Sequence, residues 1–342
     1  MRTLTVVALL ALSPAILFAQ APDASRIRAA FLKMIDRPRV ALALQTQPRA
    51  DSERYRAEQF SFASEAGERV PGIFIKSASA KDPRPVVIFL HGTGGRKEEF
   101  LATMRTFADR GFATAAIDAR HHGARITRGA GNEQYYAAMI ETFRTGQGRP
   151  YLYDTVWDVM RLVDYLATRS DVDAARIGLM GISKGATEAY IAAAVDPRIA
   201  VTVPIIGVQG YRWALDNNQW QARVDTFAPA VDGAAHAAGV TVDATFVRRF
   251  YDRVVPGIYG DHDAGSMLSL IAPRPVLVIN GDSDSLTPLA GVQEAVATAR
   301  RTYLQMGAED KLGLYLQPNA GHVVTPVAEL VMADWFVKFL KP

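Results

Sequence analysis

The chain has 342 residues, and its formal net charge is only +3. This length fits one large α/β domain with an inserted segment better than two independent domains. The small charge gives no reason to expect nucleic acid or an anionic membrane surface as a partner, and the absence of cysteine excludes disulfides and a thiol nucleophile.

Residues 1–21 resemble a secretory signal peptide. Arg2 forms a short basic region, Leu4 to Phe18 is apolar, and Ala19-Gln20-Ala21 is an A-x-A cleavage site, although cleavage after Ala19 is an alternative. The apolar run is shorter than the roughly twenty residues that span a bilayer, so we expect no stable membrane insertion. We therefore predict a secreted or periplasmic protein whose mature domain is residues 22–342.

The predicted elements alternate between strand and helix along most of the chain. An amphipathic helix at Ser25–Ile35 comes first, and a turn at Glu65-Ala66-Gly67 joins two strands into an antiparallel hairpin. The later alternation requires a mostly parallel sheet with helices on both faces. The predicted strands are 59–63, 70–76, 85–90, 112–118, 176–180, 200–206, 275–280 and 313–316, and the later helices are 97–109, 154–168 and 184–195.

The alternation breaks at residues 209–270, about sixty residues without a clear strand. Such a long connection is usually functional, and we predict a largely helical cap over the active site. Most of its aromatic residues are expected to form the cap's own core. Trp213 and Trp220 are predicted to bind substrate, because they lie closest in sequence to the strand that precedes the insertion. A shorter Gly- and Arg-rich insertion, His121–Pro150, is expected to form another rim of the pocket.

The most informative motif is Gly181-Ile182-Ser183-Lys184-Gly185, which lies between a strand-like run and a helix-like run. A serine hydroxyl is a weak nucleophile unless a tight turn exposes it beside a base and an oxyanion hole. The flanking glycines permit that turn, because a Cβ atom at either position would collide where strand and helix approach. The motif therefore predicts a nucleophile elbow with Ser183 as the nucleophile.

Two further regions supply the partners of this serine in the order that the mechanism needs. Upstream, a buried strand runs into His91-Gly92-Thr93-Gly94-Gly95, whose backbone N–H groups can face a developing oxyanion. Downstream, one strand ends in Gly281-Asp282-Ser283-Asp284, and a later one is followed by Ala320-Gly321-His322. Serine, acid and histidine in this order are typical of α/β-hydrolases.

From Gly67 to Pro342 the chain resembles α/β-hydrolases of the dienelactone hydrolase and acetyl xylan esterase type. The marks are the HGTGG turn, the stretch Ile117–Gly123, Arg176-Ile177-Gly178 before the elbow, and Ile271–Pro275. This resemblance implies a mostly parallel, doubly wound sheet with an inserted helical cap. The phrase Ile271–Pro275 also occurs in glucuronoyl esterases, whose elbow has Cys before the serine and Arg after it. Ile182 and Lys184 stand there in this chain, which argues against that narrower family.

The resemblance also assigns roles to individual residues. It implies that Ser183 is the nucleophile, His322 the base and Asp284 the acid, with Asp282 as the less favoured acid, and it needs no metal or organic cofactor. The backbone N–H groups of Lys184 and of Thr93 or its neighbour are expected to form the oxyanion hole. Asp261-His262-Asp263 looks like a ligand run, but one tripeptide lacks the separated partners that a metal site requires.

The sequence therefore predicts a secreted serine hydrolase that cleaves carboxylic esters, with a small-molecule or carbohydrate ester as substrate and an esterase of carbohydrates or plant polymers as a specific case. One alternative is a peptidase or amidase of the prolyl-oligopeptidase superfamily, whose catalytic domain has the same residue order. Another is a binding module that keeps the fold without turnover.

Overall fold

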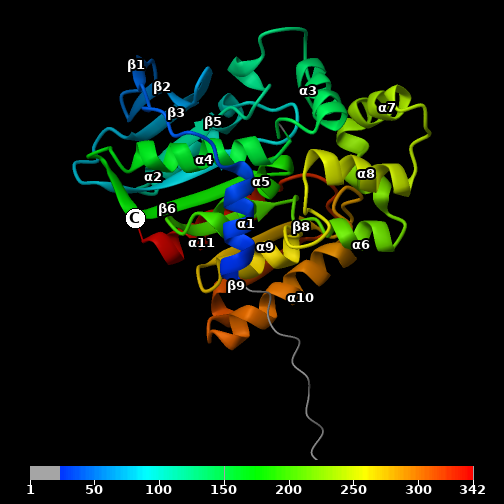
Figure 1. Cartoon of the computed structure of the whole chain (residues 1–342). Coiled ribbons are helices and arrows are strands. Elements are labelled where there is room, and N and C mark those ends of the chain that lie inside the picture. Colours follow the sequence, from blue (N-terminus) through cyan, green and yellow to red (C-terminus); the bar gives the residue numbers. More distant parts are fainter. Residues whose placement is uncertain (1–23, 150, 342) are drawn as a thin grey trace, which may run out of the picture.

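A nine-stranded sheet crosses the middle of the molecule (Figure 1). The computed structural model describes residues 24–149 and 151–341, so the predicted signal peptide lies outside the described residues. The strand order is β1-β2-β3-β5-β4-β6-β7-β8-β9. The strands are β1 (Gln45–Arg49), β2 (Tyr55–Glu65), β3 (Glu68–Ser77), β4 (Arg84–Leu90), β5 (Ala113–Ile117), β6 (Val172–Ile182), β7 (Ile199–Ile205), β8 (Val276–Gly281) and β9 (Leu312–Gln317).

The direction of pairing divides the sheet into two parts. β1, β2, β3 and β5 pair antiparallel in that order, which includes the predicted hairpin. From β5 through β4, β6, β7 and β8 to β9 every pair is parallel. The prediction of a mostly parallel sheet is therefore confirmed. Parallel strands end at the same edge of a sheet, so the loops after β4, β6, β8 and β9 lie on one side of the molecule.

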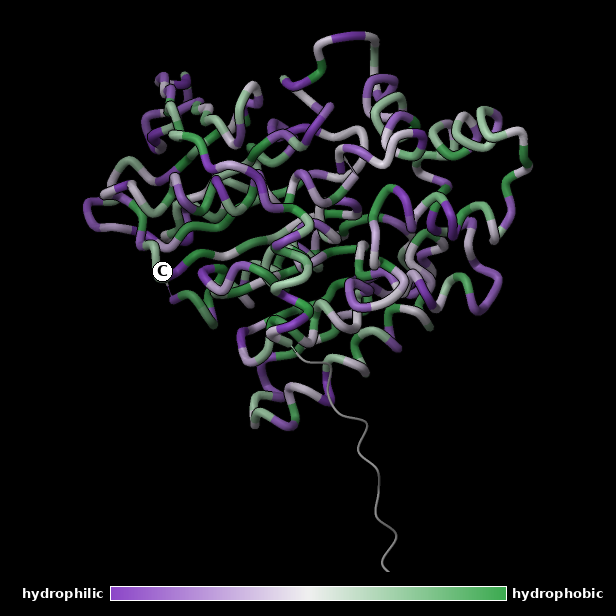
Figure 2. The backbone as a smooth tube through the Cα atoms, viewed as in Figure 1, coloured by the Kyte–Doolittle hydropathy of each residue, from purple (hydrophilic) through white to green (hydrophobic). Residues whose placement is uncertain are grey.

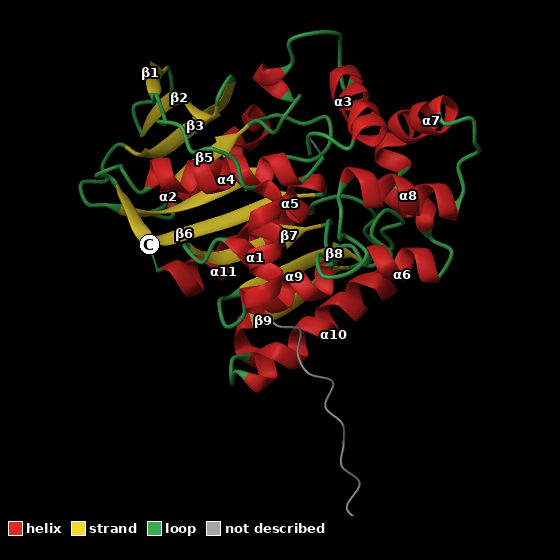
Figure 3. Ribbon diagram, viewed as in Figure 1, coloured by secondary structure: helices red, strands yellow, loops and turns green. Residues whose placement is uncertain are grey.

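Helices cover both faces of the sheet (Figure 3). The helices are α1 (Ala24–Ile35), α2 (Leu101–Asp109), α3 (Glu133–Thr145), α4 (Tyr153–Leu166), α5 (Lys184–Val195), α6 (Tyr211–Asp216), α7 (Ala228–Ala237), α8 (Ala244–Val254), α9 (Ala264–Ile271), α10 (Leu289–Gln305) and α11 (Pro326–Leu340). Short 3₁₀ turns are η1 (Lys97–Phe100), η2 (Gly123–Arg125), η3 (Trp220–Arg223), η4 (Asp225–Phe227) and η5 (Glu309–Lys311). The arrangement is the predicted doubly wound α/β-hydrolase fold.

The strand β4 shows why both faces need helices. Consecutive side chains of a strand point to opposite faces. Val86 and Ile88 belong to the hydrophobic core that also contains residues of α1, α4, α5 and α9, whereas Val87 and Phe89 pack with residues of α2 and α11. A parallel strand buried on both faces is therefore a continuous apolar run, and Figure 2 shows the apolar segments concentrated in the middle of the molecule.

The segment between β7 and β8 carries α6, η3, η4, α7, α8 and α9. Its aromatic residues pack largely against one another and against α3: Phe250, for example, stacks on Phe143 with ring centroids 5.6 Å apart. Tyr251 contacts Tyr211 and Tyr259 at 5.4 and 5.7 Å. Figure 1 shows α3, α7 and α8 grouped at one side of the sheet. The two insertions thus pack against each other, and their buried residues belong to the same hydrophobic core as those of α1, α4, α5 and α9.

Several elements have no counterpart among the sequence predictions. β1 is an edge strand whose residues are mostly exposed, so it lacks the apolar alternation by which strands are found. α3 lies within the insertion at His121–Pro150, and α10 and α11 flank the last strand. In the described part of the chain, none of the helices is both long and apolar enough to cross a bilayer.

Candidate active site

Ser183 sits at a strained turn between β6 and α5. Its backbone has φ 55° and ψ −118°, a conformation that costs an L-residue free energy and persists only where the surroundings enforce it. A Cβ atom on Gly181 would lie 2.1 Å from the carbonyl oxygen of Gly185, and one on Gly185 would lie 2.4 Å from that of Leu90. The backbone N–H of Ser183 donates to the carbonyl of Ile205 in β7 at 2.9 Å. The turn is therefore held by close backbone packing that only glycine permits.

Ser183, His322 and Asp284 form a continuous hydrogen-bonded chain. His322 Nε2 lies 2.9 Å from Ser183 Oγ, and His322 Nδ1 lies 2.8 Å from Asp284 Oδ2. The Asp284 side chain is fully buried, and that of His322 is 23% exposed. The three residues follow β6, β9 and β8, so the shared edge of the parallel strands brings them together. This is the geometry in which an imidazole can accept a serine proton.

The environment of Asp284 favours its charged form. Burial alone would raise the pKa of this carboxyl group, but hydrogen bonds from His322 and from the Thr287 hydroxyl lower the pKa below its usual value. The backbone N–H groups of Leu286 and Thr287 also donate to Asp284 Oδ1 at 2.9 and 3.2 Å. Asp284 is therefore a fixed carboxylate facing the imidazole.

Asp282, the less favoured acid, has a different position. Its oxygens accept hydrogen bonds from the backbone N–H groups of Asn319 and Ala320, at 3.0 and 3.3 Å, and from the Ser283 hydroxyl. These bonds lower the pKa of Asp282. Asp282 therefore stabilises the loop that carries His322, whereas Asp284 contacts the histidine itself.

The turn after β4 faces the elbow. A Cβ atom on Gly92 would lie 3.4 Å from Ser183 Cβ, and the turn closes through a hydrogen bond from Gly95 N–H to Gly92 O. His91 is buried: its Nε2 accepts from the Ala119 N–H, so its Nδ1 donates to Gly92 O at 2.8 Å. Burial and the nearby charge of Lys184 lower the pKa of His91 to about 3. His91 is therefore a neutral support of the turn that contains Thr93.

Lys184 is the first residue of α5, so its backbone N–H has no acceptor within the helix. Its side chain is almost completely buried and forms an ion pair with Glu188 at 2.7 Å, one helical turn further on. Thr93 and Lys184 both line the cavity that contains Ser183 and His322. The two predicted oxyanion residues are thus next to the serine, and the ammonium group of Lys184 is neutralised inside the protein.

The cavity around Ser183 is narrow. The insertion after β7 contributes four of its lining residues, Gln209, Ala222, Arg223 and Thr226, and Tyr151 comes from the loop before α4. This part of the insertion therefore lies over the serine. Trp213 and Trp220 are not among the lining residues: Trp213 packs against Gly291 at the start of α10, and Trp220 packs on the hydrophobic core.

Arg223 is a charged cavity residue that sequence reasoning misses. It is 2% exposed and lies in η3, within a segment whose other arginines, Arg212, Arg248, Arg249 and Arg253, are exposed. No local pattern separates a buried arginine from exposed ones here, because distant residues such as Tyr151 enclose it. The sequence contains no signal by which Arg223 could have been chosen.

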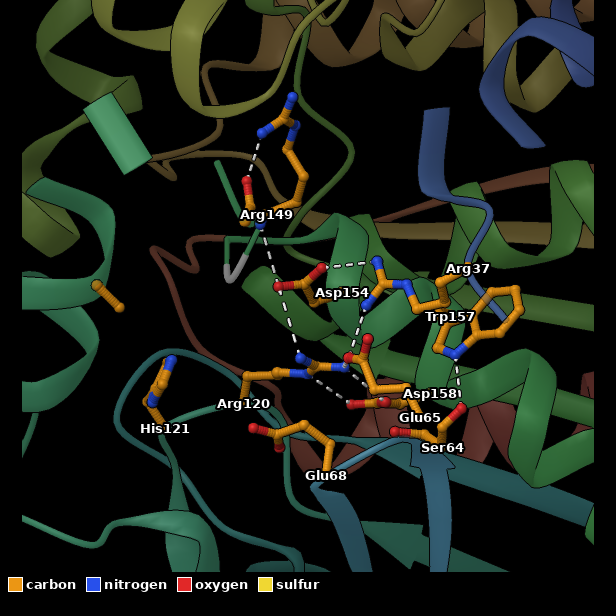
Figure 4. Close-up of polar contacts among 12 residues, drawn as sticks. Arg37, Ser64, Glu65, Glu68, Arg120, His121, Arg149, Asp154, Trp157 and Asp158 are labelled. Atoms are coloured by element: carbon orange, nitrogen blue, oxygen red, sulfur yellow. Dashed lines mark hydrogen bonds and ion pairs between the residues drawn. The ribbon is translucent and has the colours of Figure 1, made fainter. Parts of the chain in front are cut away.

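The stretch Ile117–Gly123 carries charged side chains that are paired inside the protein. Asp118 accepts hydrogen bonds from the backbone N–H and the ammonium group of Lys97, at 2.9 and 2.6 Å. Arg120 contacts Glu65 and Asp158 in a buried cluster of charges, and Asp154 lies beside it (Figure 4). These charges connect the β2–β3 hairpin, the loop after β5 and α4.

The run Asp261-His262-Asp263 is also accounted for by contacts within the protein. His262 packs edge-on against Phe31 at 5.0 Å, Asp261 pairs with Arg26, and Asp263 caps α9. Within residues 24–149 and 151–341, no group of three or more His, Cys, Asp or Glu side chains is arranged to hold a metal ion.

Comparison with known families decides what kind of protein carries this site. The family model described as "Glucuronyl esterase, fungi" matches residues 72–307, which is more than half of the chain. The chain belongs to the glucuronyl esterase family. It is a carboxylic ester hydrolase, and the predicted resemblance to α/β-hydrolase esterases is confirmed.

The relatives of this chain share less than a third of its residues in the aligned regions. The chain is 28% identical to YtaP of Bacillus subtilis, a protein whose name describes it as a hydrolase. The match covers 80% of this chain and 84% of YtaP. The chain is 26% identical to the 4-O-methyl-glucuronoyl methylesterase of Neurospora crassa over 74% of this chain, but that match spans only 60% of the fungal protein. Acetyl xylan esterase 1 from Thermoanaerobacterium sp. shares the fold, with a TM-score of 0.64, 15% identity and coverage of 93% and 94% of the two chains.

The family match corrects one sequence interpretation. Ile182 and Lys184 on either side of Ser183 argued against glucuronoyl esterases, whose elbow carries Cys and Arg there, yet the chain is a member of the glucuronyl esterase family. The matched range includes Ser183 and Asp284 and ends before His322. The two residues flanking the serine therefore vary within the family and do not define it.

Proposed function

We propose that this ester hydrolase is a serine esterase in which Ser183 forms an acyl-enzyme, His322 is the general base and acid, and Asp284 orients the histidine. The observation that carries the proposal is the hydrogen-bonded chain from Ser183 Oγ through both ring nitrogens of His322 to Asp284. The strained backbone of Ser183 supports it, because such strain concentrates at active sites.

The geometry supports the following sequence of steps. Ser183 Oγ attacks the ester carbonyl while His322 Nε2 accepts its proton, and Asp284 stabilises the imidazolium that forms. The backbone N–H groups of Thr93 and Lys184 donate to the negative oxygen of the tetrahedral intermediate. His322 then protonates the leaving alcohol. Water attacks the acyl-enzyme by the same route, which releases the acid and restores the serine.

We propose an ester of a carbohydrate or plant polymer as the substrate. Relatives of the chain are named for such bonds, as a 4-O-methyl-glucuronoyl methylesterase and an acetyl xylan esterase. The two names describe different esters, a methyl ester of a uronic acid and an acetate of a xylan hydroxyl. The proposed triad can hydrolyse either ester, so the choice between them depends on the residues that line the cavity.

Such a substrate is met outside the cell, which agrees with the proposed signal peptide at residues 1–21. We propose that the protein is exported and acts in the periplasm or the medium. Expression of the full chain followed by cell fractionation and N-terminal sequencing tests this: a mature protein that begins after Ala19 or Ala21 supports export, and an intact N-terminus in the cytoplasm contradicts it.

The catalytic assignment is tested with Ser183→Ala. Because the triad acts as a unit, we expect kcat to fall on the order of 10⁶-fold and labelling by a fluorophosphonate to disappear. Ser283→Ala is the matched control, since Ser283 is exposed and its hydroxyl donates to Asp282 rather than to a residue of the triad. Hydrolysis of methyl glucuronoyl esters, acetylated xylo-oligosaccharides and aminoacyl amides by the parent protein identifies the bond. Full turnover by the Ser183→Ala protein would overturn the assignment.

A further inference from the structure

Arg223 is a buried cation without a hydrogen-bonding partner. Its Nε and both Nη atoms are buried, and none of them has a hydrogen-bond partner among the described residues. Its guanidinium carbon lies 5.6 Å from the centre of the Tyr211 ring, a contact that provides only part of the lost solvation. Its backbone carbonyl accepts a hydrogen bond from the Tyr251 hydroxyl, so the residue itself is fixed in place.

No neighbouring group among the described residues forms a hydrogen bond with this guanidinium. Tyr151, Tyr211, Tyr251 and Tyr259 surround Arg223, and burial raises the pKa of each phenol, so all four remain uncharged. Asp263 interacts with the arginine's charge from a distance, and burial raises the pKa of its carboxyl group to about 6, so it is mostly ionised at neutral pH. The Asp263 oxygens accept instead from the backbone N–H groups of Tyr211, Arg212 and Ala264.

A buried charge without hydrogen-bond partners destabilises a protein. A ligand that brings the opposite charge removes this cost when it binds. Arg223 lines the same cavity as Ser183 and His322, so a negative group bound to its guanidinium lies beside the ester under attack. A guanidinium presents two parallel N–H donors, which match the two oxygens of a carboxylate.

We propose that Arg223 binds a free carboxylate of the substrate, so that the enzyme prefers esters carrying a second, unesterified carboxylate near the scissile bond. This inference rests on the proposed function, because it places the anion relative to Ser183. The cavity is narrow, so the carboxylate is a few bonds from the ester. Half-esters of short dicarboxylic acids and esters of small acidic sugars have this chemistry.

The test compares two methyl esters of equal size, monomethyl succinate and methyl levulinate, in which a carboxylate replaces an acetyl group. The parent enzyme is expected to have a kcat/KM at least about tenfold higher for monomethyl succinate, since a hydrogen bond to a charged group discriminates by roughly ten- to a hundredfold. In Arg223→Met this preference disappears through a higher KM for the succinate ester, while kcat/KM for the levulinate ester stays within about threefold.

Two further variants separate recognition from a structural role. Arg223→Lys keeps the charge but lacks the two-pronged donor, so it retains part of the preference. Arg212→Met, which removes an exposed arginine of the same segment, leaves the preference unchanged. Equal losses for both esters in Arg223→Met, or a parent enzyme without preference, would overturn the inference.

A binding measurement without turnover distinguishes failure of this inference from failure of the proposed function. In the Ser183→Ala protein, succinate is expected to raise the Tm more than uncharged succinamide does at equal ionic strength. The additional Arg223→Met change removes that difference. If succinate gives no Tm shift while Ser183-dependent hydrolysis of methyl levulinate persists, the serine mechanism stands and the anion site does not.

Discussion

The buried arginines Arg120 and Arg125 differ from the buried Arg223 in what faces them. Arg120 contacts the carboxylates of Glu65 and Asp158 (Figure 4), and Arg125 contacts those of Glu68 and Asp158. Arg223 faces no carboxylate within hydrogen-bonding distance among the described residues. A charge compensated by neighbours stabilises one arrangement of the chain. A charge left uncompensated inside a cavity is available to a ligand, and this difference separates the structural arginines from the proposed binding residue.

The electrostatics around Arg120 and Arg125 are consistent with a structural role. Burial would raise the pKa of Asp158, but Arg125 and Arg120 outweigh it and lower the pKa to about 2. The same carboxylates keep Arg120 charged, since they raise its pKa despite burial. Arg120 and Asp158 therefore remain ionised at neutral pH, and the charge pairs of the cluster connect strands, a loop and α4.

The largest effect is expected where a buried carboxylate faces the reacting groups. Asp284→Asn should lower kcat on the order of 10⁴-fold, because His322 loses the carboxylate that orients it, and the protein should remain folded. Asp282→Asn is the matched control and should lower kcat far less. Steady-state kinetics on one ester decide between the two carboxylates, and a reversed order of effects would mean that Asp282 is the acid.

Asp158→Asn should have the largest effect on stability. It leaves Arg120 and Arg125 without their shared carboxylate, and removing one partner of a buried charge pair typically costs about 3–5 kcal/mol of unfolding free energy. Urea denaturation measures this loss, while kcat of the folded fraction should not change. Asp109→Asn removes the exposed pair with Arg54 and should cost less than about 1 kcal/mol. Equal losses of unfolding free energy in the two variants would contradict a stabilising role for Asp158.

The stabilisation by Asp158 should depend on pH in a defined direction. Its pKa of about 2 in the folded protein lies below the value near 3.9 in an unfolded chain, so its contribution is complete above pH 5 and decreases as the pH falls toward 2. This contribution is on the order of 2 to 3 kcal/mol, and about half of it is lost at pH 3. Urea denaturation of the parent and of Asp158→Asn at pH 7 and pH 3 should therefore give a smaller difference at pH 3. A difference in unfolding free energy that is the same at pH 7 and at pH 3 would contradict this titration of Asp158.

The smallest effect on stability is expected at Arg223. Replacing an uncompensated buried cation by a side chain of similar length, as in Arg223→Met, removes a desolvation cost, so the unfolding free energy should rise or change by less than about 1 kcal/mol. The measurement is the same urea denaturation. A loss comparable to that of Asp158→Asn would show that Arg223 stabilises the insertion and would end the contrast between Arg223 and the paired arginines.

The parts of the site that sequence predicted depend on local rules. A Gly-x-Ser-x-Gly motif between a strand and a helix predicts its own turn, and the ends of parallel strands meet at one edge. The ends of the strands therefore indicated where the partners of Ser183 should lie, and the resemblance to α/β-hydrolases selected Asp284 and His322 there. The same rules located the strands from β4 to β9 within a few residues.

The parts that sequence missed depend on packing between distant segments. Trp213 lies near the serine in sequence order along the insertion, yet its ring turns toward Gly291 at the start of α10. Arg223 looks like any other arginine of a helical segment until Tyr151, Tyr211 and Tyr251 enclose it. Hydrophobic periodicity records which face of an element is buried, but it does not record which neighbour buries it, so the lining of the cavity could not be predicted.

The position of β7, between β6 and β8 in the sheet, separates two tasks along the chain. This strand contributes to the elbow through a backbone carbonyl, that of Ile205, and the chain leaves the sheet after it to form the insertion that contains Arg223. Bond cleavage and substrate choice are thus encoded in different stretches of the gene. Mutations, and even exchange of residues 209–270 between relatives, can alter the preferred ester while the reacting groups stay unchanged, which makes this insertion the natural target for evolving new specificities.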